Sequence, residues 1–234
     1  MNIIVTGASR GIGKAIAARF IREGWDAVLS SRQEATVQAA ARELATLHPS
    51  ARVAAYAADL GDPGQVDIFA RQALEFLGTV DVLVNNAGVF HPGAILEEDD
   101  GVLEDTLRVN LLSAYHLTRA VVPVMKDQRH GYIFNMCSTA SLRAYPNGGS
   151  YSISKFALLG FSKNLRQELL PCGIRVSAIC PGPTLTDSWK GFDGPEDRMM
   201  RPEDVAEVVW SACTLSPQAV LEEIVMRPQL GDIS

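Results

Sequence analysis

Hydrophobic positions along the chain fall into two alternating kinds of segment. Short, almost continuously apolar runs occupy residues 2–6, 26–31, 52–58, 81–85, 132–137, 175–180 and 222–226. Between most of them, apolar residues recur three and four positions apart, as in GKAIAARFIREG and VDIFARQALEFLG. The short runs predict strands, and the longer spacing predicts helices.

This alternation predicts an α/β fold with a parallel sheet covered by helices on both faces. Nearly continuous apolar strands such as DVLVN fit a sheet that is buried on both sides. No repeat, low-complexity tract or linker interrupts the pattern. We therefore predict a single doubly wound, Rossmann-type domain over residues 1–234, with about seven parallel strands. The long irregular stretch at about 183–201 is expected to be a substrate loop, since such loops are usually functional.

Composition and charge narrow the class of partner. The 234 residues are 47% hydrophobic and 21% charged, with a net charge of −6, which is typical of a globular protein without a basic surface for nucleic acid. No apolar run is long enough to span a membrane, and the chain begins MNIIVTG without the segments of a signal peptide. The four histidines are scattered, without metal-ligand spacing. We expect a cytoplasmic protein that binds a small molecule and no metal.

The first expected strand ends in a glycine-rich turn, TGASRGIG, at residues 6–13. In open α/β sheets, ligands bind beyond the carboxyl ends of the strands. Gly7, Gly11 and Gly13 would allow a tight turn, close approach to a pyrophosphate and close packing of the helix on the strand. A plain strand-to-helix turn is the alternative, but the position between an apolar strand and a helix favours a dinucleotide.

The end of the second expected strand indicates which dinucleotide is bound. An acidic residue there would bind the ribose of NAD, whereas an arginine favours the 2′-phosphate of NADP. This chain has Ser31 followed by Arg32, and Arg10 in the glycine turn adds a second guanidinium. The alternative is that both arginines are ordinary surface residues. We predict NADP(H).

Tyr151 and Lys155 are four residues apart at the start of an apolar helical segment, so they share a helix face. A free tyrosine has a pKa of about 10, and a nearby ammonium stabilises the phenolate. The tyrosine would then protonate a carbonyl oxygen as hydride arrives, or act as the base in reverse. Such a pair also arises by chance, so its neighbours decide. Ser138 ends one strand, and Asn110 stands near the start of a helical segment.

Taken together, TGASRGIG, Asp59, NNAG (85–88), Asn110, Ser138, YSISK and PGPTLT resemble the short-chain dehydrogenase/reductase family, in the right order from about residue 2 to residue 226. The resemblance implies a catalytic tetrad of Asn110, Ser138, Tyr151 and Lys155. Ser138 would orient the carbonyl and Tyr151 exchange the proton. Lys155 would assist the tyrosine and hold the nicotinamide ribose, and Asn110 would support a water relay behind the lysine.

The resemblance also implies the cofactor site. Asp59 would contact adenine, the Asn86–Gly88 turn would border the adenine ribose, and the Pro181–Thr186 loop would contact the nicotinamide end. The expected NADP(H)-binding residues are Gly7, Ser9, Arg10, Gly11, Ile12, Gly13, Ser31, Arg32, Asp59, Leu60, Asn86, Ala87, Gly88, Tyr151, Lys155, Pro181, Gly182, Thr184 and Thr186.

Two departures from the family pattern stand out. Cys137 precedes Ser138 where another serine is common, and the chain ends in EEIVMRPQLGDIS instead of a glycine-rich segment. An RP ending is associated with NADP-dependent reductases of hydroxy acids, serine-like compounds or pterins. Family members usually form homodimers or homotetramers through helices that correspond here to about 105–128 and 151–170.

We therefore expect an NADPH-dependent reductase of a small or medium carbonyl compound, or an alcohol dehydrogenase in reverse. An isomerase or dehydratase on the same fold, and a non-catalytic NADP sensor or interaction protein, are alternatives that the complete tetrad argues against. Arg143 and Tyr145 are candidates to line the pocket. Trp189, Phe192, Met199 and Met200 would form an apolar lid or pack beneath the loop. The acidic run 97–100 is expected to be a solvated helix start.

Overall fold

A computed structural model describes residues 1–187 and 196–232. Its parallel strands form one sheet in the order β3-β2-β1-β4-β5-β6-β7. The strands are β1 (Asn2–Val5), β2 (Asp26–Ser31), β3 (Val53–Ala57), β4 (Val82–Asn85), β5 (Gly131–Met136), β6 (Ile174–Pro181) and β7 (Glu223–Met226). All seven predicted strands are present, and the predicted fold class is confirmed.

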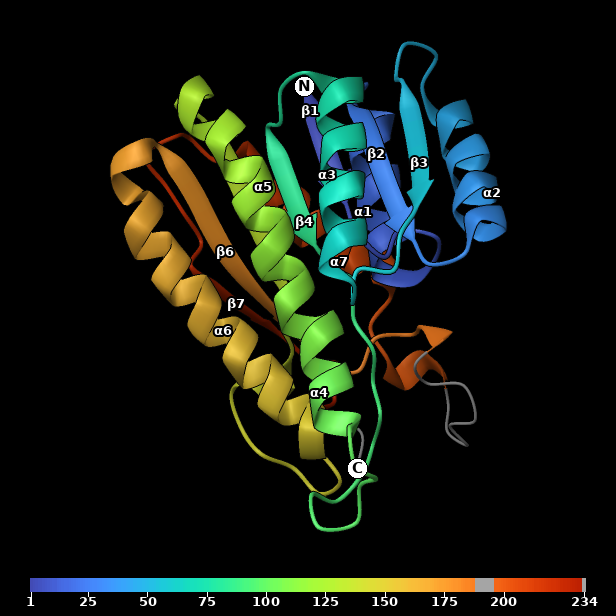
Figure 1. Ribbon diagram of the computed structural model, residues 1–234, viewed down its shortest axis with the longest axis vertical. Helices are drawn as coiled ribbons and strands as arrows, with labels where there is room; N and C mark the ends of the chain where they lie inside the picture. Colours follow the sequence, from blue (N-terminus) through green and yellow to red (C-terminus); the bar gives the residue numbers. More distant parts are fainter. Residues whose placement is uncertain (188–195, 233–234) are drawn as a thin grey trace.

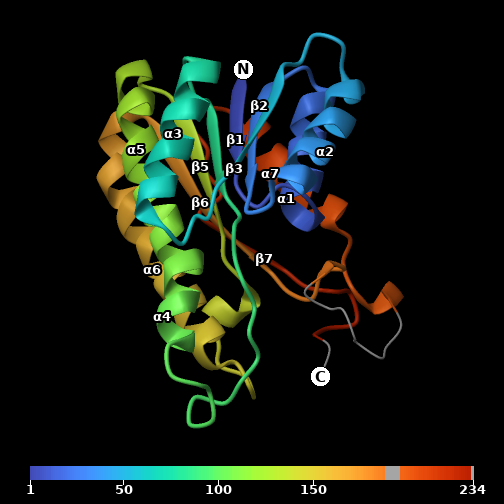
Figure 2. The same ribbon diagram turned by 45° about the vertical axis from the view of Figure 1, so that its right-hand side comes forward.

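Helices cover both faces of the sheet, as Figures 1 and 2 show. One face carries α1 (Gly11–Arg22), α2 (Glu34–Leu44) and α7 (Pro202–Thr214). The other carries α3 (Pro63–Leu77), α5 (Ser113–Gln128) and α6 (Gly149–Leu169). The short α4 (Val102–Leu107) runs into a π-helical turn at Arg108–Leu112 and then into α5. Short 3₁₀ turns occupy Ala45–Leu47, Thr139–Ser141, Leu170–Cys172 and Glu196–Arg198.

The core consists of two apolar layers, one on each side of the sheet. On the side of α1 and α7, the fully buried ring of Phe20 meets Trp25 and Trp210 edge to face, with centroids 4.9 and 5.0 Å apart. On the other side, α3 and α5 pack Phe69 and Leu117 against the sheet. Because both faces are covered, β1, β4 and β5 are buried along their whole length, which explains their continuous apolar sequences.

The strand order reverses direction at β1, which pairs with β2 on one side and β4 on the other. At such a switch point the connections leave in opposite directions and open a crevice at the carboxyl ends of the strands. Across residues 1–187 and 196–232, no helix is both long and apolar enough to cross a membrane.

Candidate active site

The turn between β1 and α1 is built around two glycines with positive φ. Gly7 has φ 63° and Gly11 has φ 57°, a conformation that residues with a Cβ atom rarely adopt. A Cβ on Gly7 would lie 3.0 Å from Cα of Ala87, and one on Gly11 would lie 3.3 Å from Cγ2 of Thr186. The first turn of α1 contains no acidic residue and no side-chain cap. The turn from Gly7 to Gly11, here called the glycine cradle, therefore leads into a helix whose first N–H groups have no side-chain cap, which favours binding of an anion such as a phosphate.

Gly13 lies outside the cleft, unlike the other predicted cofactor residues. A Cβ at this position would come 2.5 Å from Nδ2 of Asn86 and 2.6 Å from the carbonyl oxygen of Gly7. Asn86 Nδ2 also donates to the carbonyl oxygens of Thr6 (2.8 Å) and Gly7 (3.1 Å). Gly13 thus allows α1 to pack against the turn after β4, and it shapes the cradle without lining it.

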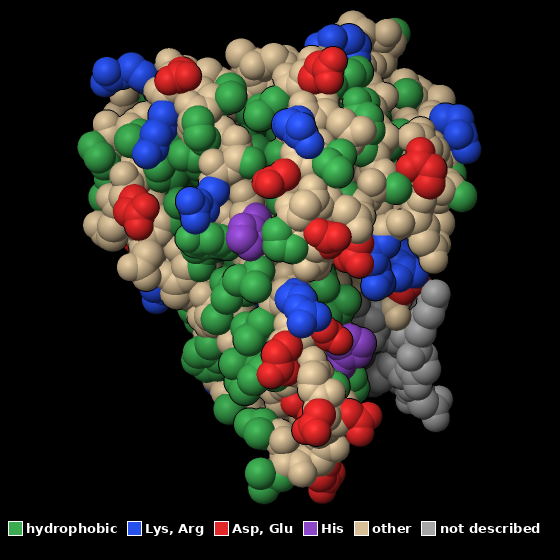
Figure 3. All heavy atoms as spheres, in the orientation of Figure 1, with side chains coloured by type: hydrophobic (Ala, Val, Ile, Leu, Met, Phe, Trp, Pro, Cys, Tyr) green, Lys and Arg blue, Asp and Glu red, His purple; other side chains and the backbone are tan. Residues whose placement is uncertain are grey.

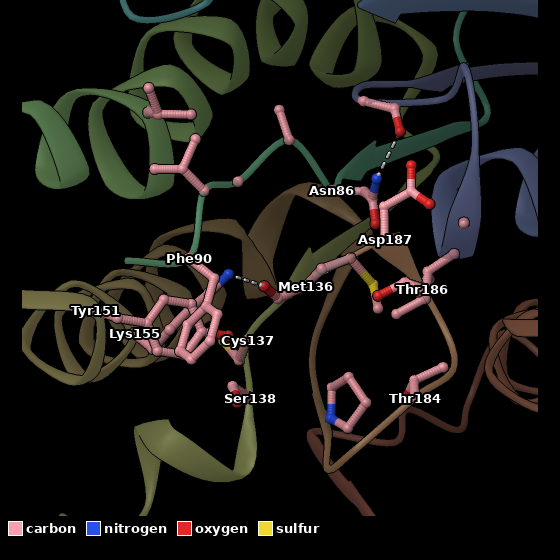
Figure 4. A pocket seen from close by; sticks show the side chains of 18 of the residues that line it. Asn86, Phe90, Met136, Cys137, Ser138, Tyr151, Lys155, Thr184, Thr186 and Asp187 are labelled. Atoms are coloured by element: carbon pink, nitrogen blue, oxygen red, sulfur yellow. Dashed lines mark hydrogen bonds between the residues drawn. The ribbon is translucent and has the colours of Figure 1, made fainter. Parts of the chain in front are cut away.

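The carboxyl ends of the strands enclose a cleft of about 920 Å³ (Figure 4). Apart from Gly13, the predicted cofactor residues all line it: Gly7, Ser9, Arg10, Gly11, Ile12, Ser31, Arg32, Asp59, Leu60, Asn86, Ala87, Gly88, Tyr151, Lys155, Pro181, Gly182, Thr184 and Thr186. Ser138 lines it too, whereas Asn110 lies behind the wall. The fold thus brings together residues that are scattered along the sequence.

Tyr151 and Lys155 lie one turn apart on α6 and face the cleft. Lys155 is only 6% exposed, and its Nζ donates a 2.8 Å hydrogen bond to the main-chain oxygen of Met136 at the end of β5. The same nitrogen lies 5.7 Å from the centroid of the Tyr151 ring. The ring also meets that of Phe90 edge to face, with centroids 4.8 Å apart, as Figure 4 shows. A buried positive charge is therefore fixed beside a phenol.

Ser138 follows β5 and begins a short 3₁₀ turn. Its Oγ accepts a 3.1 Å hydrogen bond from the N–H of Ala140, and its own N–H donates to Oγ of Ser141 at 3.1 Å. The two bonds form a capping box that holds the side chain in place. Because the hydroxyl acts as an acceptor here, its proton remains available for a ligand oxygen.

Asn110 is buried in the π-helical turn before α5 and joins two elements. Its Oδ1 accepts from the N–H of Val89 at 2.7 Å, and its Nδ2 donates to the Val89 carbonyl (3.0 Å) and to Oγ of Ser154 (2.9 Å). Both amide protons are thus used within the protein. The side chain ties the turn after β4 to α6, and the water relay expected of it stays a prediction.

The two arginines expected at the NADP phosphate differ in their contacts. Arg10 forms an ion pair with Asp187, in the loop after β6. Arg32 is exposed at the end of β2 and lines the cleft together with Gln33 and Thr36. Asp187, Gln33 and Thr36 were not among the predicted residues, since nothing in their local sequence marks them as neighbours of the glycine turn.

The end of the cleft near Tyr151 is bordered by Phe90, Tyr145 and a charged cluster. Arg143 and Arg227 both form ion pairs with the carboxylate of Asp232. Burial, with a smaller contribution from Tyr151, raises the pKa of Tyr145 to about 12. Asp232 was missed from the sequence because only the fold brings the end of the chain across to this cleft.

The expected substrate loop is described at its two ends. Thr184 pairs with Met200 in an isolated parallel bridge, and the N–H of Leu185 donates to the Met200 carbonyl at 2.8 Å. Met199 and Met200 are 8% and 9% exposed, so both are buried. Trp189 and Phe192 lie outside the described residues.

A phosphate cradle at the switch point of a doubly wound sheet, with a proton donor beyond it, is typical of dinucleotide-dependent oxidoreductases. The sequence matches the short chain dehydrogenase family over residues 1–196. The chain belongs to this family, as predicted, and is an oxidoreductase that transfers hydride between a nicotinamide cofactor and a carbonyl or alcohol substrate.

Similar proteins cover nearly the whole chain. A sepiapterin reductase from Chlorobaculum tepidum is 34% identical, over 99% of this chain and 97% of its own length. A 3α-hydroxysteroid dehydrogenase from Mediterraneibacter gnavus is 34% identical, over 87% of this chain and 85% of its own. Among solved structures, an alcohol dehydrogenase from Thermococcus sibiricus complexed with 5-hydroxy-NADP has a TM-score of 0.92 at 27% identity, covering 100% of this chain and 98% of its own. An L-sorbose reductase from Gluconobacter frateurii, complexed with NADPH and L-sorbose, has a TM-score of 0.89 at 29% identity, covering 97% and 95%.

Proposed function

We propose that this chain is an NADPH-dependent carbonyl reductase, which also runs in reverse as an alcohol dehydrogenase. Ser138 and Tyr151 act on the substrate, Lys155 assists Tyr151, and Asn110 supports them. The observation that carries the proposal is the buried ammonium of Lys155, anchored on β5 and facing the Tyr151 phenol. This pair shares one cleft with the glycine cradle, so proton transfer and cofactor binding are combined in one site.

The residues present fit a dinucleotide. Gly7 and Gly11 leave room for a pyrophosphate at the start of α1. A Cβ on Gly88 would lie 3.2 Å from Oδ1 of Asn110 and 3.6 Å from Nζ of Lys155, so glycine keeps the cleft open beside the lysine. The cofactor is NADP(H). Arg32 lies where a 2′-phosphate is expected, and similar structures hold NADPH or 5-hydroxy-NADP.

The side chains divide the chemistry between them. When bound, NADPH supplies the hydride that reduces the carbonyl carbon. The Ser138 hydroxyl donates to the carbonyl oxygen and orients it, and Tyr151 Oη transfers its proton to that oxygen. Lys155 stabilises the phenolate that remains, since an ammonium favours a nearby negative charge. Asn110 keeps the turn after β4 and α6 in fixed relation.

The substrate is a carbonyl compound of small or medium size. The end of the cleft near Tyr151 combines aromatic rings, Phe90 and Tyr145, with the Arg143–Asp232 ion pair, so it suits a molecule with polar substituents. The similar proteins are named for sepiapterin, a 3α-hydroxysteroid and L-sorbose. Sepiapterin, L-sorbose and the 3-oxosteroid that corresponds to the 3α-hydroxysteroid, with a set of simple ketones and keto acids, form the substrate panel for reduction by NADPH.

The two phenols in the cleft provide a matched test. Each variant is incubated with the panel, and turnover is followed as NADPH absorbance. Tyr151→Phe should abolish turnover while NADPH binding is kept. Tyr145→Phe should retain activity, because the high pKa of Tyr145 makes it a poor proton donor. Turnover near the wild-type rate in Tyr151→Phe would remove the proton-transfer role. Tight NADPH binding by the wild type without turnover of any substrate would favour the alternative, a non-catalytic NADP-binding sensor or interaction protein.

The chain is also proposed to form a homodimer or homotetramer through α5 and α6. Figure 3 shows hydrophobic side chains gathered over this face. Its large exposed members are Leu112, Tyr115, Ile153 and Phe156. Light scattering should give a monomer for Phe156→Glu and an oligomer for the wild type and for Ile68→Glu, a control on α3. A monomeric wild type contradicts the assembly. We place the protein in the cytoplasm, where its four free cysteines stay reduced.

A further inference from the structure

We propose that Glu98 is a positioning residue for the reaction: its carboxylate caps the start of α6 and thereby holds Tyr151 in place. The inference rests on the proposed role of Tyr151 as the proton donor. Glu98 belongs to the loop between β4 and α4, and it acts through Ser150 without touching the substrate.

The start of α6 has no side-chain cap of its own. Gly148 is the N-cap, it offers no side chain for capping, and the first turn has no acidic residue. A helix that begins in this way leaves N–H groups unpaired at the positive end of its dipole. Glu98 supplies the acceptor: its Oε1 accepts a 2.9 Å hydrogen bond from the N–H of Ser150, and its Oε2 accepts from Oγ of Ser150.

The loop and the helix fit together so closely that the contact requires a glycine. Gly149 has φ 30°. A Cβ at this position would overlap Oε1 of Glu98 and come 2.5 Å from the Gly93 carbonyl oxygen. The N–H of Gly93 also donates to the Asn147 carbonyl at 3.1 Å. The loop is therefore attached to the chain on both sides of the helix start.

The same loop contacts the ring of Tyr151 and the residue directly before it. Glu98 binds the main chain of Ser150, the residue directly before the tyrosine. Phe90, at the beginning of the loop, packs edge to face on the tyrosine ring. Loss of the cap would let the first turn of α6 shift, and a misplacement of about 1 Å at a reacting group can cost about 100-fold in rate.

Glu98 lies in the acidic run 97–100, which we expected to serve the helix that follows it. That helix, α4, begins at Val102 with Gly101 as its N-cap. The Glu98 carboxylate instead reaches the start of α6, while the neighbouring Glu97 is exposed. The two glutamates therefore form a matched pair for an experiment.

The first measurement compares Glu98→Ala, Glu98→Gln and the control Glu97→Ala at saturating NADPH. We expect kcat of Glu98→Ala to fall about 10-fold or more, with a smaller change in the NADPH Kd because most of the cofactor residues lie elsewhere in the cleft. Glu98→Gln should recover most of kcat, since an amide oxygen still accepts from Ser150. An unchanged kcat in Glu98→Ala, or an equal loss in Glu97→Ala, would overturn the proposal.

The second measurement does not depend on turnover. Amide hydrogen exchange over residues 148–155 should be faster in Glu98→Ala than in the wild type and Glu97→Ala, with and without NADPH. Unchanged protection would overturn the proposal. If the wild type turned over no substrate, the proposed function would fail, and the exchange rates would still decide whether Glu98 holds α6.

Discussion

Lys155 Nζ and the main-chain oxygen of Met136 lie 2.8 Å apart, and their hydrogen bond joins α6 to the central sheet. Met136 ends β5, and Ser138 follows two residues later. One strand end therefore supplies both the anchor for the ammonium and the hydroxyl proposed to bind the substrate oxygen. A buried ammonium without such a partner would carry a large desolvation cost.

Replacement of this lysine tests its charge separately from its length. Lys155→Met keeps an unbranched apolar side chain but removes the ammonium, so the Tyr151 phenolate loses its stabilisation. We expect kcat to fall by about 100-fold or more, the usual range for loss of general acid–base assistance. Lys163→Met, on the same helix but paired with Glu223 at the surface, is the control and should retain wild-type kcat. Nearly equal activity in the two variants would exclude a role for the charge.

The preference for NADP depends on the arginines at the cleft. Arg32→Ala should weaken NADPH binding by about 1.5–3 kcal/mol, the range for a hydrogen bond to a charged group, and leave NADH binding nearly unchanged. Titration of both cofactors by fluorescence measures the difference. Arg22→Ala, exposed at the end of α1, should change neither. An equal loss for NADPH and NADH in Arg32→Ala would contradict the assignment.

The sheet was predictable because a strand buried on both faces leaves a simple trace in the sequence. β4 and β5 are nearly continuous apolar runs, and each predicted strand end lies close to the observed one. Since parallel strands end at one edge, residues just after them, such as Ser138 and Asn86, line the same cleft. Their common cleft follows from topology more than from any local motif.

Contacts between distant loops were not predictable from periodicity. The acceptor for α6 comes from Glu98, and Asp232 reaches Arg143 from the end of the chain. Neither pair has a fixed spacing, because each depends on how loops fold over the sheet edge. Gly13 belongs to the predicted glycine motif but does not line the cleft, and its missing Cβ lets α1 pack against the turn after β4.

That packing role gives a prediction for Gly13→Ala. The new methyl would meet the Gly7 carbonyl oxygen at 2.6 Å, and backbone cannot move aside as a side chain can. We expect a loss of about 1–3 kcal/mol in the free energy of unfolding, as for other overpacked sites, together with weaker NADPH binding. Gly64→Ala, in the first turn of α3, brings a methyl 3.2 Å from a side-chain oxygen of Asp62 and should be nearly neutral. Chemical denaturation measures both, and equal stabilities would show that the turn can adjust.

The cap on α6 predicts a dependence of stability on pH. The Ser150 hydroxyl and then the Ser150 N–H lower the pKa of Glu98, and His91 adds to this, against the smaller effect of burial. Because the pKa is lower in the folded protein, the stabilisation is complete above the ordinary carboxyl value of 4.5 and is lost as the pH falls through the folded value. The exposed carboxylates of the same loop, Glu97, Asp99 and Asp100, are common to the wild type and Glu98→Gln. The difference in Tm between these two proteins should therefore be constant from neutral pH down to about 5 and shrink below it. His91→Ala, made in both the wild type and Glu98→Gln, removes the contribution of His91 to the pKa of Glu98. A Tm difference that persists unchanged at low pH would contradict the prediction.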